Sequence, residues 1–439
     1  MTILEVLAAQ CLDSRGNPTI QVDVRTSQGI FRARVPSGAS TGKHEAIELR
    51  DHDKPAFGGK GVLKAVSNVQ DVIGPALIEK MFDVKTQQKD IDAFMCELDG
   101  TPNKGRLGAN AILGVSMACA RAGAAAAEMP LYEFLRLEAN QQGVYVLPVP
   151  FFNMLNGGVH SGNTMAFQEL MVAPTGAQSV TQAVQMGSEI YHALKDVITK
   201  KYGPGATGTA DEGGFAPPIT TLDEGLNLLS AAVAVAGYTG MVRYAIDPAS
   251  SEFFKDGHYD IGFKTDTPCL KTPEEMMELY TRILADYPIA LLEDPFAEDD
   301  WESWTKFHSN CSHELVGDDL LVTNINRVKI AHEKKACNAM LLKVNQIGTV
   351  SEAIEAAKFA KSLDWSVFVS HRSGETVDDF IADLTVALST GHMKAGAPCR
   401  GERVAKYNRL MEIEAESNTS WKPWAYAGEN YRDPCISII

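Results

Sequence analysis

Two segments near the N-terminus alternate apolar and polar residues. They are TIQVDVR (19–25) and IFRARV (30–35), and a Ser-Gln-Gly turn lies between them. Two alternating segments joined by a short turn predict a half-buried β-hairpin. Apolar residues then recur at helical spacing in 61–81, 84–99 and 109–128. The first third of the chain is therefore predicted to be a small sheet backed by helices.

The pattern changes near residue 142. The polar stretch 140–143 is followed by Pro148 and Pro150, which favours a domain boundary at this point. We therefore predict an N-terminal α+β domain over 1–142 and a C-terminal domain over 143–439.

In the C-terminal part, five apolar runs end in polar residues, as is typical of buried parallel strands. These runs are VRYAID (242–247), IALLED (289–294), ELVGDD (314–319), MLLKVN (340–345) and SVFVSHR (366–372). Helices are predicted between them where a hydroxyl can cap the first turn and an acid follows. Such starts occur at Thr272-Pro273-Glu274-Glu275, Thr349-Val350-Ser351-Glu352 and Thr376-Val377-Asp378-Asp379.

The polar residues at the ends of these runs are regularly spaced. Asp318 lies 25 positions after Glu293, Lys343 lies 25 after Asp318, and His371 lies 28 after Lys343. Each interval has the length of one strand plus one helix, which predicts a β/α barrel. Because the carboxyl ends of barrel strands converge on one face, these side chains are expected to share a site.

Composition narrows the classes of partner. With 56 acidic and 40 basic residues the formal net charge is −16, which opposes extended contact with nucleic acid or anionic lipid. The apolar stretch 111–120 is too short to span a bilayer, and the N-terminus lacks a signal-peptide pattern. The eight cysteines show no C-x-x-C spacing and are interpreted as reduced, mostly buried thiols. We expect a cytoplasmic protein with no membrane segment and no nucleic-acid partner.

Three carboxylates, Asp247, Glu293 and Asp318, stand at successive predicted strand ends. Close together they would repel one another unless a divalent cation neutralised them, and oxygen ligands favour Mg²⁺. A single acid at a strand end is as often a helix cap or a solvated residue, but three in register favour a metal site. Lys343 lies within an apolar run, where burial and metal charge would lower its pKa and make it a general base. The alternative is a structural lysine that pairs with one of the acids.

Further polar groups could bind an anion or act as a general acid. His371, Arg372 and Ser373 place an imidazole, a guanidinium and a hydroxyl side by side, a combination suited to phosphate or carboxylate. Lys394 adds a cation, although surface solvation is the commoner role of such residues taken singly. A loop at 36–42 and a glycine-bordered histidine in 156–162 are weaker signals. Candidate general acids are His160, Glu169 and Glu212.

Nine short motifs together give the chain a close resemblance to the enolase family of the eukaryotic type. They are SGASTG, NGG-x-H, QE, DEGG, EDPF, DDL, LLKVNQIGT, SHRSGET and GAP-x-R-x-ER. The resemblance extends from DSRGNPT (13–19) to AGEN (427–430), which is nearly the whole chain. It implies an N-terminal α+β domain of three strands and four helices, followed by an eight-stranded β/α barrel that opens with two antiparallel strands. It also implies a homodimer that reversibly dehydrates a phosphorylated substrate, 2-phospho-D-glycerate, to phosphoenolpyruvate.

The resemblance also implies a role for each matching residue. Lys343 matches the base that removes the C2 proton, and Glu212, supported by Glu169, matches the acid that assists departure of the C3 hydroxyl. Two Mg²⁺ ions per active site are implied. The matching metal ligands are Asp247, Glu293 and Asp318 for the first ion and Ser40 for the second. The matching substrate-binding positions are His160, Glu169, Glu293, Asp318, Ser370, His371, Arg372, Ser373 and Lys394.

The chain departs from the family pattern at Val159 and Gly401, neither of which matches a ligand position. Two alternatives remain open: an enzyme of the wider superfamily that acts on another acid sugar, and a non-enzymatic surface-binding protein on the same scaffold. The phosphate-side residues Arg372, Ser373 and Ser40 disfavour the first. The second would be expected to have lost an acid, a base or a ligand, and each expected position is filled.

Overall fold

The computed structural model describes residues 1–39 and 42–434 of the chain. Its N-terminal part begins with an antiparallel sheet in the order β1-β2-β3, formed by β1 (Glu5–Leu12), β2 (Pro18–Thr26) and β3 (Gly29–Arg34). The predicted hairpin is confirmed as β2 and β3. Val22 and Val24 of β2 are fully buried and their neighbours are more exposed, which is the alternation that the sequence showed.

Four helical segments accompany this sheet, as the resemblance implies. The first runs through α1 (Leu63–Ser67), a π-helical segment (Asn68–Ile73) and α2 (Gly74–Lys80), and it is followed by α3 (Gln88–Asp99), α4 (Ala109–Ala126) and α5 (Leu131–Glu138). Helix α4 packs on β2 and β3. A Cβ atom on Gly114 of α4 would lie only 2.5 Å from Val22 Cγ2, so the glycine permits the close approach of helix and sheet.

Helix α4 is also the most apolar helix. Among the described residues it alone has the length and mean hydropathy, 1.2 over 18 residues, of a helix that could cross a membrane. However, 83% of that window is buried within the protein, which is the property of a core helix. The apolar stretch 111–120 underestimates this helix, because flanking alanines and glycines extend it in both directions.

The C-terminal part is a closed eight-stranded barrel. Its strands are β5 (Val149–Asn156), β6 (Glu169–Ala173), β7 (Arg243–Asp247), β11 (Ile289–Glu293), β12 (Glu314–Gly317), β13 (Ala339–Leu342), β14 (Ser366–Ser370) and β15 (His392–Lys394). They neighbour one another in chain order, and β15 pairs with β5 to close the ring. Strand β6 is antiparallel to both β5 and β7, and the other pairings are parallel. The antiparallel opening implied by the resemblance is therefore confirmed.

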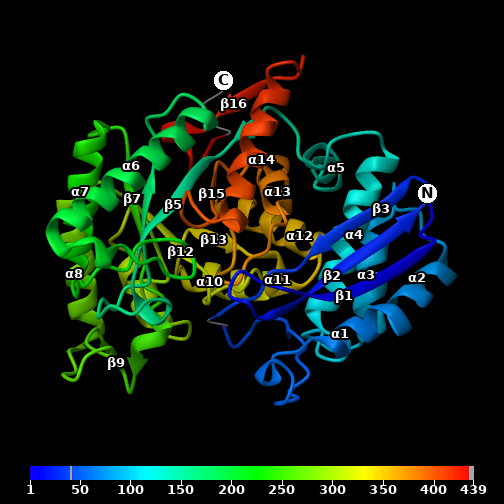
Figure 1. The fold of residues 1–439 in the computed structure, drawn as a ribbon, viewed down its shortest axis with the longest axis horizontal. Coiled ribbons are helices and arrows are strands. Elements are labelled where there is room, and N and C mark those ends of the chain that lie inside the picture. The colour runs from blue at the N-terminus through cyan, green and yellow to red at the C-terminus, as the bar shows by residue number, and fades with distance from the viewer. Residues whose placement is uncertain (40–41, 435–439) are drawn as a thin grey trace.

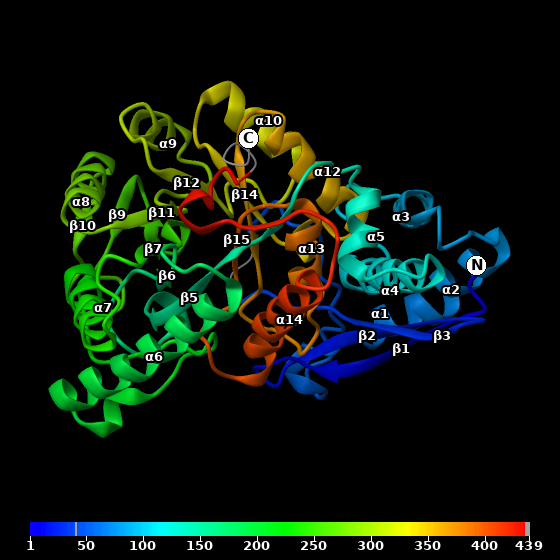
Figure 2. The ribbon, with the colours of Figure 1, turned by 90° about the horizontal axis from the view of Figure 1, so that it is seen from above.

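Helices surround the barrel, and the N-terminal sheet and helices lie to one side of it (Figures 1 and 2). The helices are α6 (Val180–Tyr202), α7 (Leu222–Ala236), α8 (Pro273–Asp286), α9 (Trp301–His308), α10 (Ile325–Lys334), the short α11 (Val344–Ile347), α12 (Val350–Lys361), α13 (Phe380–Leu388) and α14 (Gly401–Ser417). Two small sheets complete the fold: β4 (Tyr145–Leu147) with β16 (Trp424–Tyr426), and β8 (Phe254–Lys255) with β9 (His258–Asp260) and β10 (Leu270–Lys271). The division at residues 142 and 143 stays a prediction.

Two of the three predicted helix starts are confirmed. Thr272 forms a capping box with Glu275 at α8, and Thr349 caps α12 by accepting the Glu352 N–H. The third is wrong, because α13 begins only at Phe380. Asp378 accepts the Phe380 N–H at 3.0 Å and is itself held by a residue of α4, so a contact distant in sequence determines where this helix begins.

The cysteines are less buried than expected. Of the seven that the structure describes, Cys119 and Cys337 are buried, Cys269 is exposed and four are intermediate. Cys269 lies in the loop before β10, where an apolar thiol gains no contact with the core. Cys435 lies outside the described residues.

Apolar side chains fill the barrel interior. Phe151, Leu291, Leu341 and Phe368 are all fully buried within it. A filled interior leaves the mouth at the carboxyl ends of the parallel strands as the place where polar side chains can meet. The reversed strand β6 begins at that same mouth, because Glu169 pairs with Asp247 at the end of β7.

Candidate active site

Most of the predicted site residues meet at the mouth of the barrel. A small cavity is lined by Gln168 and by nine of the predicted residues. Those nine are His160, Glu169, Glu212, Lys343, Ser370, His371, Arg372, Ser373 and Lys394. Asp247, Glu293 and Asp318 lie against two of the lining lysines. The predicted ligand Ser40 lies outside the described residues.

Lys394, the last residue of β15, lies among three acids. Its Nζ is 2.7 Å from Glu293 Oε2, 3.3 Å from Glu169 Oε2 and 3.4 Å from Asp247 Oδ2. All four side chains are buried. Burial alone would lower the pKa of Lys394, but the three carboxylates raise it well above its ordinary value. The ammonium therefore neutralises part of the acidic cluster.

Asp318, the third predicted ligand, has different partners. Its Oδ2 lies 2.5 Å from Lys343 Nζ, and its Oδ1 accepts a hydrogen bond from Gln346 Nε2 at 2.8 Å. Burial raises the pKa of Asp318, but Lys343 outweighs it, so that this pKa falls below its ordinary value. By contrast, burial and the negative charges of neighbouring carboxylates raise the pKa of Asp247 and of Glu293.

The carboxylate oxygens of Asp247, Glu293 and Asp318 are ligand atoms that suit a hard cation. Neither carboxylate oxygen of Glu293 accepts a hydrogen bond from a described residue, although both oxygens are buried and Lys394 lies near one of them. A buried carboxylate without hydrogen bonds is costly unless a cation binds it. Asp247, Glu293 and Asp318 supply only oxygen donors, as Mg²⁺ prefers. The donor set therefore fits the predicted metal.

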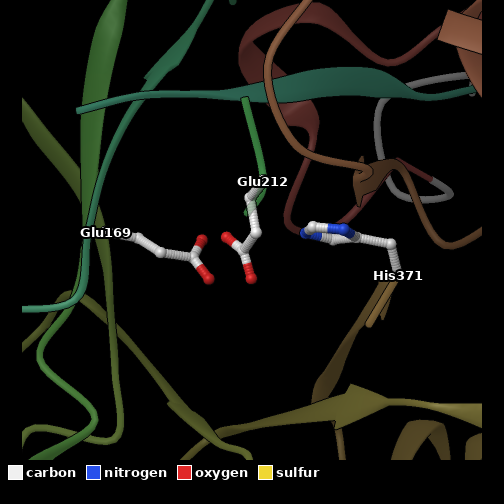
Figure 3. Close-up of side chains that lie close together, drawn as sticks. All are labelled: Glu169, Glu212 and His371. Carbon is white, nitrogen blue, oxygen red and sulfur yellow. The ribbon is translucent and has the colours of Figure 1, made fainter. Parts of the chain in front are cut away.

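Two other groups of ligand atoms are more compact in the described residues. Within each group, one ligand atom per residue lies within 4.8 Å of the others. The groups are Glu169, Glu212 and His371 (Figure 3), and Asp294, Asp318 and Asp319. The three predicted ligands Asp247, Glu293 and Asp318 are not one of these groups, and their assignment to the metal stays a prediction. Asp294 is already engaged, because its two oxygens accept the N–H groups of Asp318 and Asp319 at 2.9 and 2.8 Å.

The sequence predicted that burial and the charge of a bound metal together lower the Lys343 pKa, and the structure bears on the burial part of this prediction alone. Lys343 follows β13 and is only partly exposed, and burial of its ammonium is the largest influence and lowers its pKa. The negative charge of Asp318, helped by Glu293, outweighs burial and leaves the pKa above its ordinary value. The alternative of a lysine paired with an acid thus describes the contact seen here, and the role of base requires that the Asp318 charge be neutralised.

Glu169 and Glu212 form an acidic pair. Figure 3 shows their carboxylates facing each other, with the His371 ring on the far side of Glu212. Asn153 donates to Glu212 Oε2 at 2.8 Å, while His160 Nδ1 lies 3.6 Å from Glu212 Oε1. Burial first, and then the charge of Glu212, raise the pKa of Glu169 to about 7. Near neutral pH the pair therefore holds a proton that it could donate.

The predicted anion-binding residues contact the N-terminal part of the chain. Arg372 Nη1 lies 2.9 Å from Glu45 Oε2 and donates to Asn345 Oδ1 at 2.8 Å. The Ser373 hydroxyl accepts the Ala39 N–H at 2.9 Å. The segment before residue 40 is thus attached to the strand end that carries the guanidinium.

His160 lies in a single 3₁₀ turn, Gly158–His160, that follows β5. Its ring nitrogens are buried and make no hydrogen bond to a described residue, and burial lowers the pKa of the imidazole. Lys264, in the loop between β9 and β10, holds this turn. Its Nζ donates to the carbonyl oxygens of Gly158 and of Ser161, the latter at 2.9 Å.

Several residues of the site were not predicted from the sequence. Asn153 and Asn345 are polar residues inside or next to apolar strand runs, which is a signal that could have identified them. Glu45 and Lys264 lie in loops without such a signal, since only the fold brings them to the mouth. Arg403 lies in the GAP-x-R-x-ER motif, and its contacts are described below.

Two family models match the chain. Residues 3–135 match the model described as Enolase, N-terminal domain. Residues 144–434 match the model described as Enolase, C-terminal TIM barrel domain. Together the two matches cover nearly all of the described structure.

Proposed function

The chain belongs to the enolase family, and from this premise we propose that it is a glycolytic enolase of the eukaryotic type, which reversibly dehydrates 2-phospho-D-glycerate to phosphoenolpyruvate. The observation that carries the proposal is that the Lys343 ammonium and the Glu169–Glu212 pair line one cavity together with Arg372. A base, a proton donor and an anion-binding group are the parts that such a dehydration requires.

Each group has a role in the proposed reaction. Lys343 takes the proton from C2 of the substrate, and Glu212 delivers a proton to the C3 hydroxyl, which leaves as water. Glu169 supports this transfer because it shares a proton with Glu212. Mg²⁺ held by Asp247, Glu293 and Asp318, with a second ion at Ser40, would stabilise the negative charge that builds up on the substrate carboxylate.

Arg372 and Ser373 are proposed to bind the substrate phosphate. A guanidinium binds phosphate through two parallel hydrogen bonds. At about 4 Å and an effective dielectric constant near 20, one such pair of unit charges contributes roughly 4 kcal/mol. Local cations of this kind could attract an anion despite the net charge of −16. On the family resemblance we also propose a cytoplasmic homodimer.

The test is an assay of the purified protein with Mg²⁺ and 2-phosphoglycerate, followed by the ultraviolet absorbance of the enol phosphate. Lys343→Met keeps the apolar stem and removes the amine, and it should lower kcat by about 100-fold or more because the base is lost. Lys195→Met, on the exposed face of α6, is the matched control and should retain activity. Absence of product with the unmodified enzyme would reject the function, and full turnover by Lys343→Met would reject the base.

A further inference from the structure

Arg403 is a fully buried arginine in the first turn of α14, with no exposed side-chain surface. Its Nη1 lies 2.6 Å from His371 Nδ1 and donates to the carbonyl oxygen of Arg372 at 2.7 Å. Its Nη2 donates to the carbonyl oxygens of Ser373 at 2.6 Å and of Asp211 at 2.9 Å. One guanidinium therefore joins the strand end that carries His371 to the loop that carries the acid of the Glu169–Glu212 pair.

This contact determines where His371 carries its proton. A guanidinium stays protonated in proteins and has only donor groups, so His371 Nδ1 must be the acceptor. A neutral imidazole whose Nδ1 accepts a hydrogen bond carries its proton on Nε2. A second proton on this ring would place two cations 2.6 Å apart in a buried site. Burial first, and then Arg403, lower the pKa of His371 well below its ordinary 6.5.

The free edge of the ring faces the cavity. Figure 3 shows the edge of the His371 ring that is farther from the backbone directed at Glu212. A ring nitrogen lies within 4.8 Å of carboxylate oxygens of Glu169 and Glu212, and His371 lines the cavity with both acids. Since Arg403 occupies Nδ1, the polar group that His371 offers to the cavity is the Nε2–H donor.

We propose that Arg403 is a positioning residue that fixes His371 as a neutral imidazole with its proton on Nε2, so that His371 donates a hydrogen bond to the departing oxygen of the substrate or to Glu212. His371 then neither accepts nor releases a proton during the reaction. The inference rests on the proposed function and adds to it a residue that the sequence analysis did not identify. Because His371 releases no proton, the proton that the departing hydroxyl takes up comes from the Glu169–Glu212 pair.

The other charged groups near His371 do not change this conclusion. The cations that face it are Arg403, Lys394, Lys343 and Lys406, and each disfavours a second proton on the ring. The nearby anions are Glu169 and Glu212. A carboxylate beside Nε2 accepts a hydrogen bond from it, which favours the same tautomer as Arg403 does.

The decisive measurement is ¹⁵N NMR of the full-length protein labelled at histidine, without substrate. The His371 signals are assigned by their loss in His371→Gln. In the unmodified protein, Nδ1 should show the shift of an unprotonated nitrogen and Nε2 that of a protonated one, with no titration between about pH 6 and pH 8. A proton on Nδ1, or a titration in that range, would overturn the proposal without the need for any variant.

Two variants separate positioning of the ring from support of the loops. Arg403→Gln removes the fixed donor and the charge, so His371 should titrate within that pH range or gain the Nδ1–H tautomer. Arg400→Gln is the matched control, because Arg400 donates to Ala210 and Ser14 on the same side of the site but makes no contact with His371. It should leave the His371 signals unchanged. An unaltered tautomer in folded Arg403→Gln would refute the inference.

Kinetics provides the functional readout. Arg403→Gln should lower kcat by about 100-fold with a much smaller change in KM, because the hydrogen bond acts on the departing oxygen. A change confined to KM would contradict this role. The NMR result does not depend on which substrate is used, so failure of the proposed reaction and failure of the tautomer assignment are distinguishable.

Discussion

The buried acids of the site differ in pKa because each one has a different set of charged neighbours. Asp318 touches Lys343 and its pKa is lowered, whereas the pKa of Glu169 rises to about 7 beside Glu212. Both groups are buried, so burial alone cannot explain the difference. The difference comes from the sum of the neighbouring charges, because Lys343, Arg372 and Lys394 lower the pKa of Asp318, whereas Glu212 raises that of Glu169 against Lys394.

The raised pKa of Glu169 predicts a dependence of stability on pH. Between about pH 4.5 and pH 7 the native protein holds a proton that the unfolded chain has released, so its free energy of unfolding falls as the pH rises. Glu169→Gln mimics the protonated form and should gain up to roughly 3 kcal/mol relative to the unmodified protein across this range. Urea unfolding in EDTA at several pH values measures the difference.

The matched control for this measurement is Glu278→Gln, on the exposed face of α8. Its free energy of unfolding should change with pH in the same way as that of the unmodified protein. If the free energy of unfolding of Glu169→Gln also changes with pH in this way, Glu169 does not hold the proton.

For single residues, the sequence predicts which side chains lie in the same site but not which of them contact one another. Regular spacing of strand ends brings Asp247, Glu293 and Asp318 to one face, and the structure confirms that each stands at a strand end. The contact of Lys394 with two of these acids, and of Lys343 with the third, depends on side-chain positions within a few ångströms. For the same reason the direction of the Lys343 pKa could not be predicted from burial alone.

Among the elements, the five parallel strands β7, β11, β12, β13 and β14 were predicted, whereas β5, β15 and the reversed strand β6 were not. Each of the five has an apolar run that ends in a polar residue, and the polar end marks the mouth of the barrel. Strand β6 has the opposite order, since its site residue Glu169 is its first. The sequence therefore gave Glu169 only as a candidate acid without a strand, and the direction of that strand was implied only by the family resemblance.

The loop between β9 and β10 gives a prediction about the turn that carries His160. Lys264 donates to the backbone of that turn, and burial lowers the pKa of this lysine to about 8. Lys264→Met should release the turn and lower kcat/KM about 10-fold, because hydrogen bonds from a charged donor contribute roughly 1.5–3 kcal/mol. Hydrogen exchange of the Gly158 and Ser161 amides should become faster.

Lys255→Met is the control, because Lys255 is an exposed residue at the end of β8 in the same small sheet. It should change neither hydrogen exchange nor activity. Unchanged exchange in Lys264→Met would show that the turn is held by its own backbone contacts.

Across the whole molecule, a partly buried ion pair joins the N-terminal helices to the barrel. Arg121 of α4 donates to both carboxylate oxygens of Asp378 at 2.9 Å, and Arg121 lowers the pKa of this acid although burial raises it. Asp378→Asn leaves the partly buried Arg121 guanidinium with Asp379 as its remaining acidic partner and should lower the free energy of unfolding by about 2–4 kcal/mol. Urea unfolding at neutral pH measures this loss.

A surface pair provides the comparison. Asp23 pairs with Arg32 at 2.7 Å on the exposed face of the N-terminal sheet. Asp23→Asn should cost less than about 1 kcal/mol, since water replaces the lost partner. Equal losses for the two variants would contradict the structural role of the Arg121–Asp378 pair.

The sequence predicted the order of the two parts of the fold, but it did not predict the contacts between the N-terminal helices and the barrel. A change of hydrophobic period near residue 142 predicts a small sheet with helices followed by a barrel, as observed. Periodicity shows which face of α4 is apolar, but it does not show that Arg121 at its edge meets Asp378. Such contacts involve single polar residues more than 250 positions apart, and no local pattern marks them.

The contact between Arg372 and Glu45 limits how this protein can be divided or recombined. The barrel supplies the guanidinium and some of its contacts, but Glu45 and Ala39, which also contact this strand end, come from the N-terminal part of the chain. A barrel expressed alone, or joined to an unrelated N-terminal part, would keep the acids and the lysines and lose the groups that orient its anion-binding edge. The catalytic unit is therefore the whole chain, and attempts to transplant this chemistry should carry both halves together.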